Sequence, residues 1–389
     1  MKHIHYYIYA LLFAATLAAC SNDDFNDKLT TSDEVNGPIT FSASAQTDAP
    51  TRAISDGYRP WTTTDPQSMG VFGFFNLNKA NFDKQNGTTA ADQFFKNTQV
   101  SYAETPVSPF TGKWSYASPK YWPDYTWCNS YDFFAYMPYK EGTTIASTDG
   151  TNFTVTIPGV TLSQAVQTDI DNSPYLICNL PVNKTVPGEV IEYEMDQTLA
   201  AFQIRFKLGQ DMENVRDIFI KGVKIKGNLP NYGDISRTYR WDGSKWSNSA
   251  IVWSNTKNQS NVDETTIAFA NIGTDGKAQY YDNVKSKLHI VSTDSLSWGK
   301  PFKVIPNGFN PTIEVTYDVT TNKVDNSTLT RHDVVSEIKF SNGFFKTYTE
   351  AAQTGKINPI LINIVPSYLY VLADDDQKGY LIVNQTAAP

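Results

Sequence analysis

Residues 313–319 read Ile-Glu-Val-Thr-Tyr-Asp-Val, with an apolar side chain at every second position and a polar one between. Successive side chains of a β-strand point to opposite faces of the sheet, so Ile313, Val315, Tyr317 and Val319 share one face. The pattern predicts a strand with one buried face and one exposed face. Such strands favour a β-sandwich over a parallel sheet with crossover helices.

Similar strand signals occur along most of the chain. The 22 Tyr, 22 Phe, 20 Pro and 22 Gly fit many short strands joined by turns. Helix signals are few, and the best is a short piece around residues 90–97. We therefore expect an all-β fold with few short helices. The further expected strands are residues 39–45, 69–75, 152–157, 200–206, 218–225, 266–269, 334–340 and 359–365.

The length of 389 residues exceeds the size that one hydrophobic core usually serves, which predicts two domains. The clearest boundary signal is residues 181–188, where two prolines and a glycine separate strand-like runs. We place the division near residue 186. The expected domains are residues 53–186 and residues 187–389.

Charge excludes one class of partner. The formal net charge is −8 and the sequence pI is near 5.1, and no basic stripe interrupts the acidic balance. A nucleic-acid phosphate backbone would be repelled and not gathered by such a chain. We expect no nucleic-acid partner.

The first twenty residues have the features of a bacterial lipoprotein signal. Lys2 gives a weakly positive start, residues 6–16 form a mostly apolar run too short to cross a bilayer, and residues 17–20 read Leu-Ala-Ala-Cys. This last motif resembles a lipobox, in which the cysteine thiol is acylated and becomes the new N-terminus. We expect removal of residues 1–19 and a lipid on Cys20. An ordinary cleaved signal with an incidental cysteine is the alternative.

Cys128 and Cys178 are the two cysteines that remain after that removal. An exported location permits a disulfide, but the two residues stand fifty positions apart and carry no spacing signature. The sequence is compatible with two alternatives, a disulfide between these cysteines and two separate buried thiols.

A polar tether and a first strand, residues 20–52, precede the expected main body. Residues 23–35 are acidic with few apolar side chains, which is typical of a flexible linker. A half-buried strand follows at residues 39–45, and then a loop of small and polar residues that is open to proteases. The apolar residues of this strand are Ile39, Phe41, Ala43 and Ala45.

Tyr121-Trp122-Pro123 is followed by Tyr-Asp-Phe-Phe-Ala-Tyr-Met-Pro at residues 131–138. These are the most specific of several segments that, in order along the chain, resemble the fimbrillin (Mfa-like) family of type V pilus subunits. Gln197 stands nearest to the position where the family often has a histidine. The aromatic side chains of Trp122, Phe133, Phe134 and Tyr136 are expected to fill a sandwich interior. Other matching segments are residues 51–53, 69–72, 199–206, 304–307, 312–319 and 355–365.

The resemblance implies two tandem β-sandwich domains of transthyretin-like topology and a structural role in a cell-surface fimbria. It implies that an arginine-specific protease cuts between Arg52 and Ala53, that the first strand with Ile39, Phe41 and Ala43 leaves, and that a strand of a neighbouring subunit replaces it. Residues 368–372 are either part of a donor hairpin or an ordinary edge strand. The candidate donor strand is Tyr380, Leu381, Ile382 and Val383.

The same resemblance implies a location and a set of partners. The location is the cell outer membrane, as a surface-exposed lipoprotein, and the fimbria after processing. The partners are other fimbrial subunits, an arginine-specific protease and, through the lipid, the outer membrane. Host or microbial surface glycans are a further candidate. A non-polymerising anchor or accessory lipoprotein is one alternative role.

No enzyme, cofactor or metal site is expected. His289 and His332 lack a third partner at a catalytic or metal-ligand spacing, and common catalytic motifs are absent from the sequence. A glycan-binding adhesin is the second alternative, because four tryptophans lie in segments rich in Asn, Ser and Gly. Residues 241–246 equally fit a hairpin that returns a tryptophan to the core. The four tryptophans are Trp241, Trp246, Trp253 and Trp298.

Overall fold

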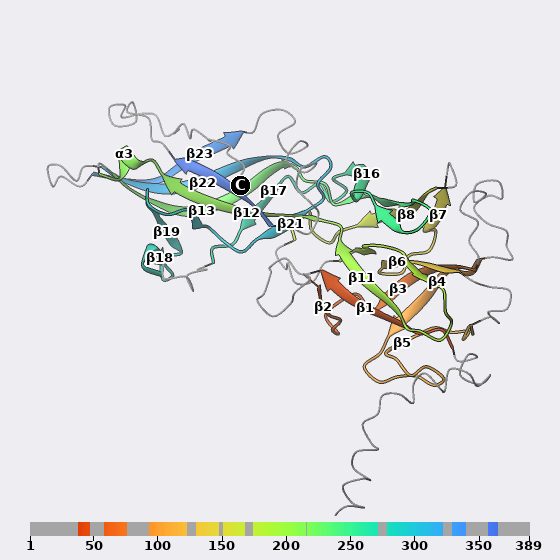
Figure 1. The fold of residues 1–389 in the computed structure, drawn as a ribbon. Helices are drawn as coiled ribbons and strands as arrows, with labels where there is room; N and C mark the ends of the chain where they lie inside the picture. The colour runs from red at the N-terminus through yellow and green to blue at the C-terminus, as the bar shows by residue number, and fades with distance from the viewer. Residues whose placement is uncertain are drawn as a thin grey trace, which may run out of the picture.

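The described chain is almost entirely β-strand. In these residues the only helical pieces are two short turns, α3 (Gln210–Glu213) and η3 (Ala278–Tyr280) (Figure 1). The expected all-β class is confirmed. The computed structural model describes residues 38–46, 58–75, 93–122, 130–147, 151–167, 174–214, 216–270, 278–321, 329–339 and 357–364.

Two sheets enclose the first buried cluster. Nine described strands form the larger sheet in the order β2-β1-β11-β9-β6-β3-β4-β5, with β10 also paired to β6. The second sheet has the order β15-β14-β8-β7, with β16 paired to β14. The strands of the larger sheet are β1 (Phe41–Gln46), β2 (Tyr58–Pro60), β3 (Ser68–Phe75), β4 (Gln93–Tyr102), β5 (Trp114–Ser115), β6 (Tyr131–Met137), β9 (Leu176–Cys178), β10 (Val182–Lys184) and β11 (Ile191–Gln197). Those of the smaller sheet are β7 (Thr144–Ser147), β8 (Asn152–Thr161), β14 (Tyr232–Trp241), β15 (Trp246–Asn248) and β16 (Val252–Lys257).

Two further sheets enclose the second buried cluster. One has the order β20-β12-β21 with β24 paired to β12, and the other has the order β18-β19-β13-β22-β23 with β17 paired to β13. Their strands are β12 (Ala200–Leu208), β13 (Arg216–Asn228), β17 (Glu264–Ile267), β18 (Tyr281–Asp282), β19 (Lys287–Ile290), β20 (Leu296–Ser297), β21 (Phe302–Val304), β22 (Asn310–Thr321), β23 (Leu329–Lys339) and β24 (Ile357–Ile364).

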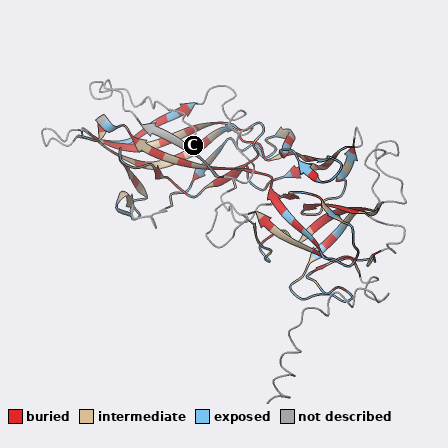
Figure 2. Ribbon diagram, viewed as in Figure 1, coloured by how far each residue is buried: buried red, intermediate tan, exposed pale blue. Residues whose placement is uncertain are grey.

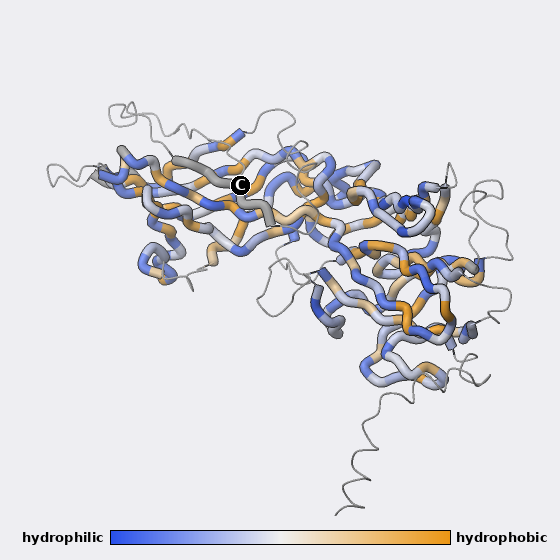
Figure 3. The backbone as a smooth tube through the Cα atoms, viewed as in Figure 1, coloured by the Kyte–Doolittle hydropathy of each residue, from blue (hydrophilic) through white to orange (hydrophobic). Residues whose placement is uncertain are grey.

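Alternating burial follows the sequence pattern in β22. Ile313, Val315, Tyr317 and Val319 are all buried, while the polar residues between Ile313 and Tyr317 are half-buried. This strand lies between β13 and β23 and pairs antiparallel with both. The predicted one-sided strand is confirmed, and the same alternation of hydrophobic and hydrophilic residues is visible along many strands (Figure 3).

The aromatic run of β6 is covered on both faces. All seven residues from Tyr131 to Met137 are buried, and the strand lies between β3 and β9 (Figure 2). Phe133 and Phe134 are adjacent in sequence and both fully buried, which requires packing on opposite faces of the sheet. The expected core positions of these two residues, Trp122 and Tyr136 are confirmed.

The chain crosses between the two clusters more than once. The first cluster takes residues from 39 to 199, again from 235 to 253, and Ile305. The second takes Ala165, Val166 and most of the other buried residues after 200. The expected division near residue 186 falls before β11, which still belongs to the first sheet. The transthyretin-like topology stays a prediction.

The predicted helical piece at residues 90–97 is wrong where the structure describes it. β4 begins at Gln93 and pairs with β3. Phe95 is fully buried, and its ring packs edge-on against the rings of Phe41 and Tyr116 with centroids 5.4 Å and 5.3 Å away. Packing of these rings and cross-strand pairing outweigh the local helix preference of the preceding alanines.

Two pairings of the described strands are parallel. β1 pairs with β11, and β12 pairs with β24 over residues 201–208 and 357–364. Each joins segments about 150 residues apart in the sequence, from Phe41 to Ile191 and from Ala201 to Ile357. Local alternation carries no information about such distant partners, so the sequence did not predict them.

The carboxyl group of Asp318, beside the second cluster, makes the stability of the fold depend on pH. Burial would raise the pKa of this carboxyl, but hydrogen bonds from Lys287, the Asp333 N–H and Lys221 outweigh it and lower the pKa to about 2. A lowered pKa stabilises the fold above the unfolded value of 3.8 by about 2 kcal/mol, and this contribution is lost as pH falls through the folded value. Denaturant unfolding should therefore show a deficit of Asp318→Asn at neutral pH that shrinks between about pH 4 and pH 2. A deficit independent of pH would contradict this.

Candidate functional site

The first strand is inserted into the larger sheet near its edge. β1 pairs parallel with β11 from Phe41 opposite Ile191 to Ala45 opposite Met195. Its other edge pairs antiparallel with the three-residue strand β2. In Figure 1, β2, β1 and β11 lie side by side in the lower right part of the molecule. We call the surface that β1 covers, made by β2, β11 and the core side chains beneath, the first-strand groove.

Apolar side chains anchor the first strand in the groove. Ile39 is fully buried, and Phe41 and Ala45 are each 2% exposed. The Phe41 ring packs against four other aromatic rings, and burial of such a side chain contributes about 1.5–3 kcal/mol. These rings are Phe95, Tyr116, Phe133 and Tyr193, with centroid distances of 5.4, 5.9, 6.2 and 6.2 Å.

Hydrogen bonds fix the start of the strand. The Ile39 N–H donates to the Lys120 carbonyl at 2.8 Å, and the Tyr116 hydroxyl donates to the Ile39 carbonyl at 3.0 Å. The Tyr121-Trp122 segment of the sequence motif follows directly after Lys120. The segment before β6 thus holds the entry of β1 in place.

The middle of the first strand fills its surroundings incompletely. Ser42, Ala43 and Ser44 are small and only half-buried. A hollow of about 430 Å³ lies between them and residues 180–182 and 192–194. A second hollow of about 440 Å³ adjoins Ser42 and Ala43 and is lined on its other side by aromatic residues such as Trp114. A strand with larger side chains could bury more surface here.

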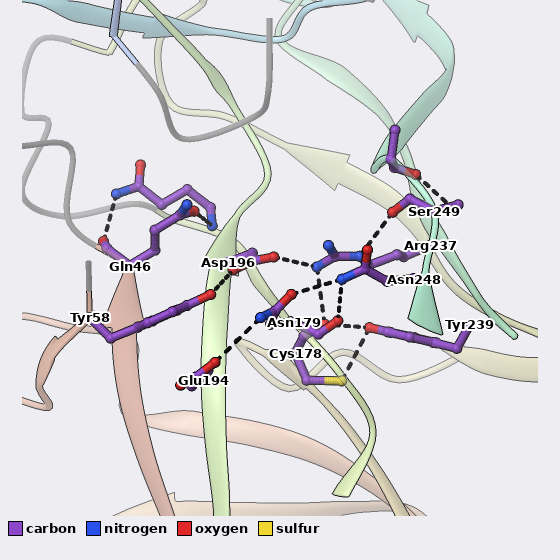
Figure 4. Close-up of polar contacts among 12 residues, drawn as sticks. Gln46, Tyr58, Cys178, Asn179, Glu194, Asp196, Arg237, Tyr239, Asn248 and Ser249 are labelled. Atoms are coloured by element: carbon purple, nitrogen blue, oxygen red, sulfur yellow. Dashed lines mark hydrogen bonds and ion pairs between the residues drawn. The ribbon is translucent and has the colours of Figure 1, made fainter. Parts of the chain in front are cut away.

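The end of the first strand is polar. The side-chain oxygen of Gln46 accepts the Gln197 N–H at 3.0 Å, and the Gln197 side chain donates back to the Gln46 carbonyl at 2.9 Å. On β2, the Tyr58 hydroxyl donates to Asp196 at 2.5 Å. Asp196 also forms an ion pair at 2.7 Å with Arg237 of the second sheet. Figure 4 shows Tyr58, Asp196 and Arg237 linked in a chain from β2 across β11 to β14, with Gln46 of β1 nearby.

Burial governs the electrostatics of this polar end. Arg237 and Asp196 are 6% and 8% exposed, and the guanidinium also donates to the carbonyls of Cys178 and Ser249 at 3.1 Å and 3.2 Å. Burial raises the pKa of the Tyr58 hydroxyl, and its hydrogen bond to Asp196 raises it further. Tyr58 therefore stays protonated and acts as a hydrogen-bond donor.

Cys178 lies beside this cluster as a free, buried thiol. Its sulfur is 3.1 Å from the Tyr239 hydroxyl, and burial raises the pKa of the thiol. Cys128, the other member of the candidate disulfide, lies outside the described residues. A neutral buried thiol of this kind is a packing group and not a reactive nucleophile.

Three buried polar atoms bordering the first strand have no hydrogen-bond partner among the described residues. They are Trp61 Nε1, Tyr193 Oη and Gln197 Oε1. Trp61 lines one hollow and Tyr193 the other, and Gln197 contacts the end of β1. Buried polar groups normally have a hydrogen-bond partner, so β1 leaves more polar atoms of the groove without a hydrogen bond than is typical of a protein core.

The structure describes part of the predicted site. Ile39 and Phe41 lie in the core and Ala43 is half-buried beside the hollows, but their removal from the fold stays a prediction. The lipidation residue, the processing residues and the donor strand lie outside the described residues: Cys20, Arg52, Ala53, Tyr380, Leu381, Ile382 and Val383.

Sequence reasoning missed the polar end of the groove. Asp196 and Arg237 are 41 positions apart, and neither belongs to a motif. One signal was the departure from the family pattern at Gln197, the residue that contacts the end of β1. A charged residue at an alternating core position, as at Arg237 between Ile235 and Tyr239, would have marked a buried partner.

Three of the four candidate glycan-stacking tryptophans are buried. Trp246, Trp253 and Trp298 are 6%, 2% and 1% exposed, and their indole N–H groups donate to Asp132, Thr198 and Ile267. Trp241 is half-buried opposite Trp246 across the turn at residues 242–245. The hairpin interpretation is confirmed, and these three rings form no exposed platform.

The two histidines among the described residues, His289 and His332, each lie beside an aspartate. His289 lies in β19, with its Nε2 3.2 Å from Asp217 and its ring stacked on Phe219 at 4.6 Å. His332 is exposed beside Asp318. Among the described residues, His, Cys, Asp and Glu side chains form no group of three or more that could hold a metal ion. In the same residues, none of the helices has the length and apolar character needed to span a membrane.

Comparison with known proteins gives one match over most of the chain. A family model described as fimbrillin-like matches residues 51–331 of the 389. Comparison with curated proteins found no match. The match by family model therefore includes most of both buried clusters but not β1.

Solved structures similar to the chain include three from Bacteroides and Parabacteroides species. A fimbrial protein from Bacteroides vulgatus is 17% identical, with 90% of this chain and 99% of that chain covered and a TM-score of 0.44. A candidate cell adhesion protein from Bacteroides ovatus is 12% identical, with coverages of 84% and 92% and a TM-score of 0.36. Another from Parabacteroides distasonis is 10% identical, with coverages of 90% and 98% and a TM-score of 0.37.

Proposed function

The chain belongs to the fimbrillin-like family, and from this premise we propose that it is a structural subunit of a cell-surface fimbria that polymerises by strand exchange. In this proposal the precursor is exported as an outer-membrane lipoprotein anchored through Cys20. An arginine-specific protease cuts after Arg52, the first strand leaves, and residues 380–383 of another subunit enter the groove. The role is mechanical and needs no catalytic group.

One observation carries the proposal. β1 contributes buried side chains to the first cluster, yet it precedes the expected cut, so cleavage after Arg52 would separate it from everything that follows. The strand would then be held by non-covalent contacts alone. Its departure would expose an apolar groove and the unpaired edge of β11, which a strand from another chain can fill by β-augmentation. Head-to-tail contacts of this kind do not close, and so they produce a filament.

Arg59 illustrates why the expected cut lies at Arg52. Arg59 belongs to β2, pairs opposite Ala45, and forms two hydrogen bonds with Asp65 at 2.6 Å and 2.5 Å. Pro60 follows it on the carboxyl side. A protease needs an extended, accessible segment, and a bound arginine before a proline is a poor substrate.

We expect Arg52→Ala to abolish processing and polymer formation. Surface-sheared protein from the wild type should begin at Ala53, as read by Edman or mass-spectrometric analysis. The variant should remain a lipoprotein that begins at acylated Cys20. Arg59→Lys is the matched control, because it removes the other nearby arginine while keeping the charge beside Asp65, and it should be processed normally.

Two results would change the proposal. Unchanged polymer in Arg52→Ala would remove the cleavage step. Wild-type surface material that begins at Cys20 would identify the protein as a non-polymerising anchor or accessory subunit.

A further inference from the structure

The last residue of the first strand is held by a reciprocal pair of hydrogen bonds. Strand pairing between β1 and β11 ends at Ala45 and Met195. Beyond this pair, the Gln197 N–H donates to the side-chain oxygen of Gln46 and not to a main-chain carbonyl of β1. The Gln197 side chain binds the Gln46 carbonyl in return. The two bonds require different groups of the strand that fills the groove: one requires a side-chain acceptor, and the other requires only a main-chain carbonyl.

The bond to the Gln46 carbonyl can be made by any residue, because it uses the main chain. The bond from the Gln197 N–H needs a side-chain acceptor at one position of the strand. Gln197 is 2% exposed, so an apolar side chain in place of Gln46 would leave the main-chain N–H of Gln197 buried and unpaired. Leaving a buried donor unpaired is more costly than the modest gain of an ordinary hydrogen bond. The groove therefore discriminates by sequence at this position.

We propose that Gln197 sets the register of the strand in the groove and selects strands with a glutamine at the position of Gln46. The inference rests on the proposed strand exchange. It assigns the incoming strand to residues 380–385 of a second copy, with Gln385 in the place of Gln46.

The sequence supports this register. Residues 41–50 read Phe-Ser-Ala-Ser-Ala-Gln-Thr-Asp-Ala-Pro, and residues 380–389 read Tyr-Leu-Ile-Val-Asn-Gln-Thr-Ala-Ala-Pro. Five positions match at equal spacing: Phe41 and Tyr380 are both aromatic, and Gln46, Thr47, Ala49 and Pro50 correspond to Gln385, Thr386, Ala388 and Pro389. The other candidate segment fails this comparison, since Ala373 follows Tyr368 by five positions where Gln46 follows Phe41. The match with residues 41–50 therefore favours residues 380–389, and not residues 368–372, as the incoming strand.

The side chains of the groove fit the same register at two places. Ile382 would take the position of Ala43, which adjoins both hollows, and would bury more apolar surface than the alanine. Tyr380 would take the position of Phe41 among its aromatic neighbours. Asn384 is a mismatch, because it would replace the tightly buried Ala45.

A peptide displacement experiment on the full chain tests the inference. The chain is cut after Arg52, and labelled peptides of residues 378–389 are titrated onto it. The Gln385→Leu peptide should bind roughly tenfold to a hundredfold more weakly than the wild-type peptide, the loss expected for one buried unpaired donor. The Lys378→Ala peptide, altered outside the repeat, should bind like the wild type.

A second measurement tests the same contact on the chain's own strand. After the cut, the fragment that ends at Arg52 should dissociate faster from a Gln46→Leu protein by roughly the same tenfold to hundredfold factor. Ser42→Ala, which changes a half-buried residue of the same strand, is the control and should leave the rate unchanged.

The outcomes separate this inference from the proposed function. Equal binding of the wild-type and Gln385→Leu peptides would overturn selection by Gln197 and leave strand exchange intact. Binding of neither peptide, with an unchanged fragment rate in Gln46→Leu, would overturn both. Binding of neither peptide with faster loss of the Gln46→Leu fragment would overturn the assignment of residues 380–385 as the incoming strand.

Discussion

Replacing Phe41 by alanine should destabilise the uncut chain by about 3–5 kcal/mol and leave the assembled fibre at wild-type stability. The Phe41 ring is 2% exposed and contacts four other aromatic rings, so its removal leaves a large cavity in the first cluster. In the fibre the first strand has gone, and the side chain at this place belongs to another subunit. The defect should therefore disappear on assembly.

Denaturant unfolding of the precursor and thermal melting of purified fibres measure the two states. Phe302→Ala is the matched control, because Phe302 is equally buried but lies in the second cluster, which the cut does not change. It should weaken precursor and fibre alike. Should the Phe41→Ala precursor fail to fold, Phe41→Leu leaves a smaller cavity and permits the same comparison. A Phe41→Ala fibre as weak as its precursor would show that the first strand is still in the groove.

The sequence predicted the individual strands well, because burial on one face leaves a direct periodic signal. The alternation at residues 313–319 lies in the one-sided strand β22, and the expected strand at residues 200–206 lies within β12. The first strand was also predicted, although it begins at Phe41 and ends at Gln46, slightly later than expected. A local pattern is sufficient for this level of structure.

Pairing between distant strands was beyond the same reasoning. The sequence pattern identifies β1 as a half-buried strand, but nothing in the composition of β1 indicates that β11 is its parallel partner. The crossing of β14 to β16 back to the first cluster likewise depends on how sheets stack and not on any local turn signal. Residues 90–97 show the reverse error, since a local helix preference was overruled by partners that the sequence does not reveal.

The polar end of the groove was unpredictable for a third reason. A buried ion pair has meaning only in its folded surroundings, because Asp196 and Arg237 look like ordinary surface charges in the sequence. In the fold their ion pair connects β11, the strand beside β1, to β14 of the second sheet. Tyr58 of β2 donates to Asp196, and Arg237 donates to the Cys178 carbonyl of β9. The stability of the fold and the shape of the groove therefore both depend on the Asp196–Arg237 ion pair.

Arg237→Met should cost about 3–5 kcal/mol, because it leaves the Asp196 carboxylate buried without its counter-charge. Methionine fills a similar volume, so the loss comes mainly from the unpaired charge. The Asp196→Asn, Arg237→Met double variant removes both charges and should recover a substantial part of the stability. Denaturant unfolding of the wild type, both single variants and the double variant gives the coupling energy of the pair.

Lys113→Met breaks the exposed pair with Glu104 and is the control, for which solvent screening predicts little change. If Arg237→Met were as mild as this control, Asp196 would have to be satisfied by Tyr58 and water alone, and the polar end would not hold β11 in place. A large loss in the single variant with recovery in the double variant would instead show that the edge of the groove is kept rigid by a charge pair anchored in the second sheet. That rigidity is what an exchanging strand requires, since the groove must keep its shape while its occupant changes.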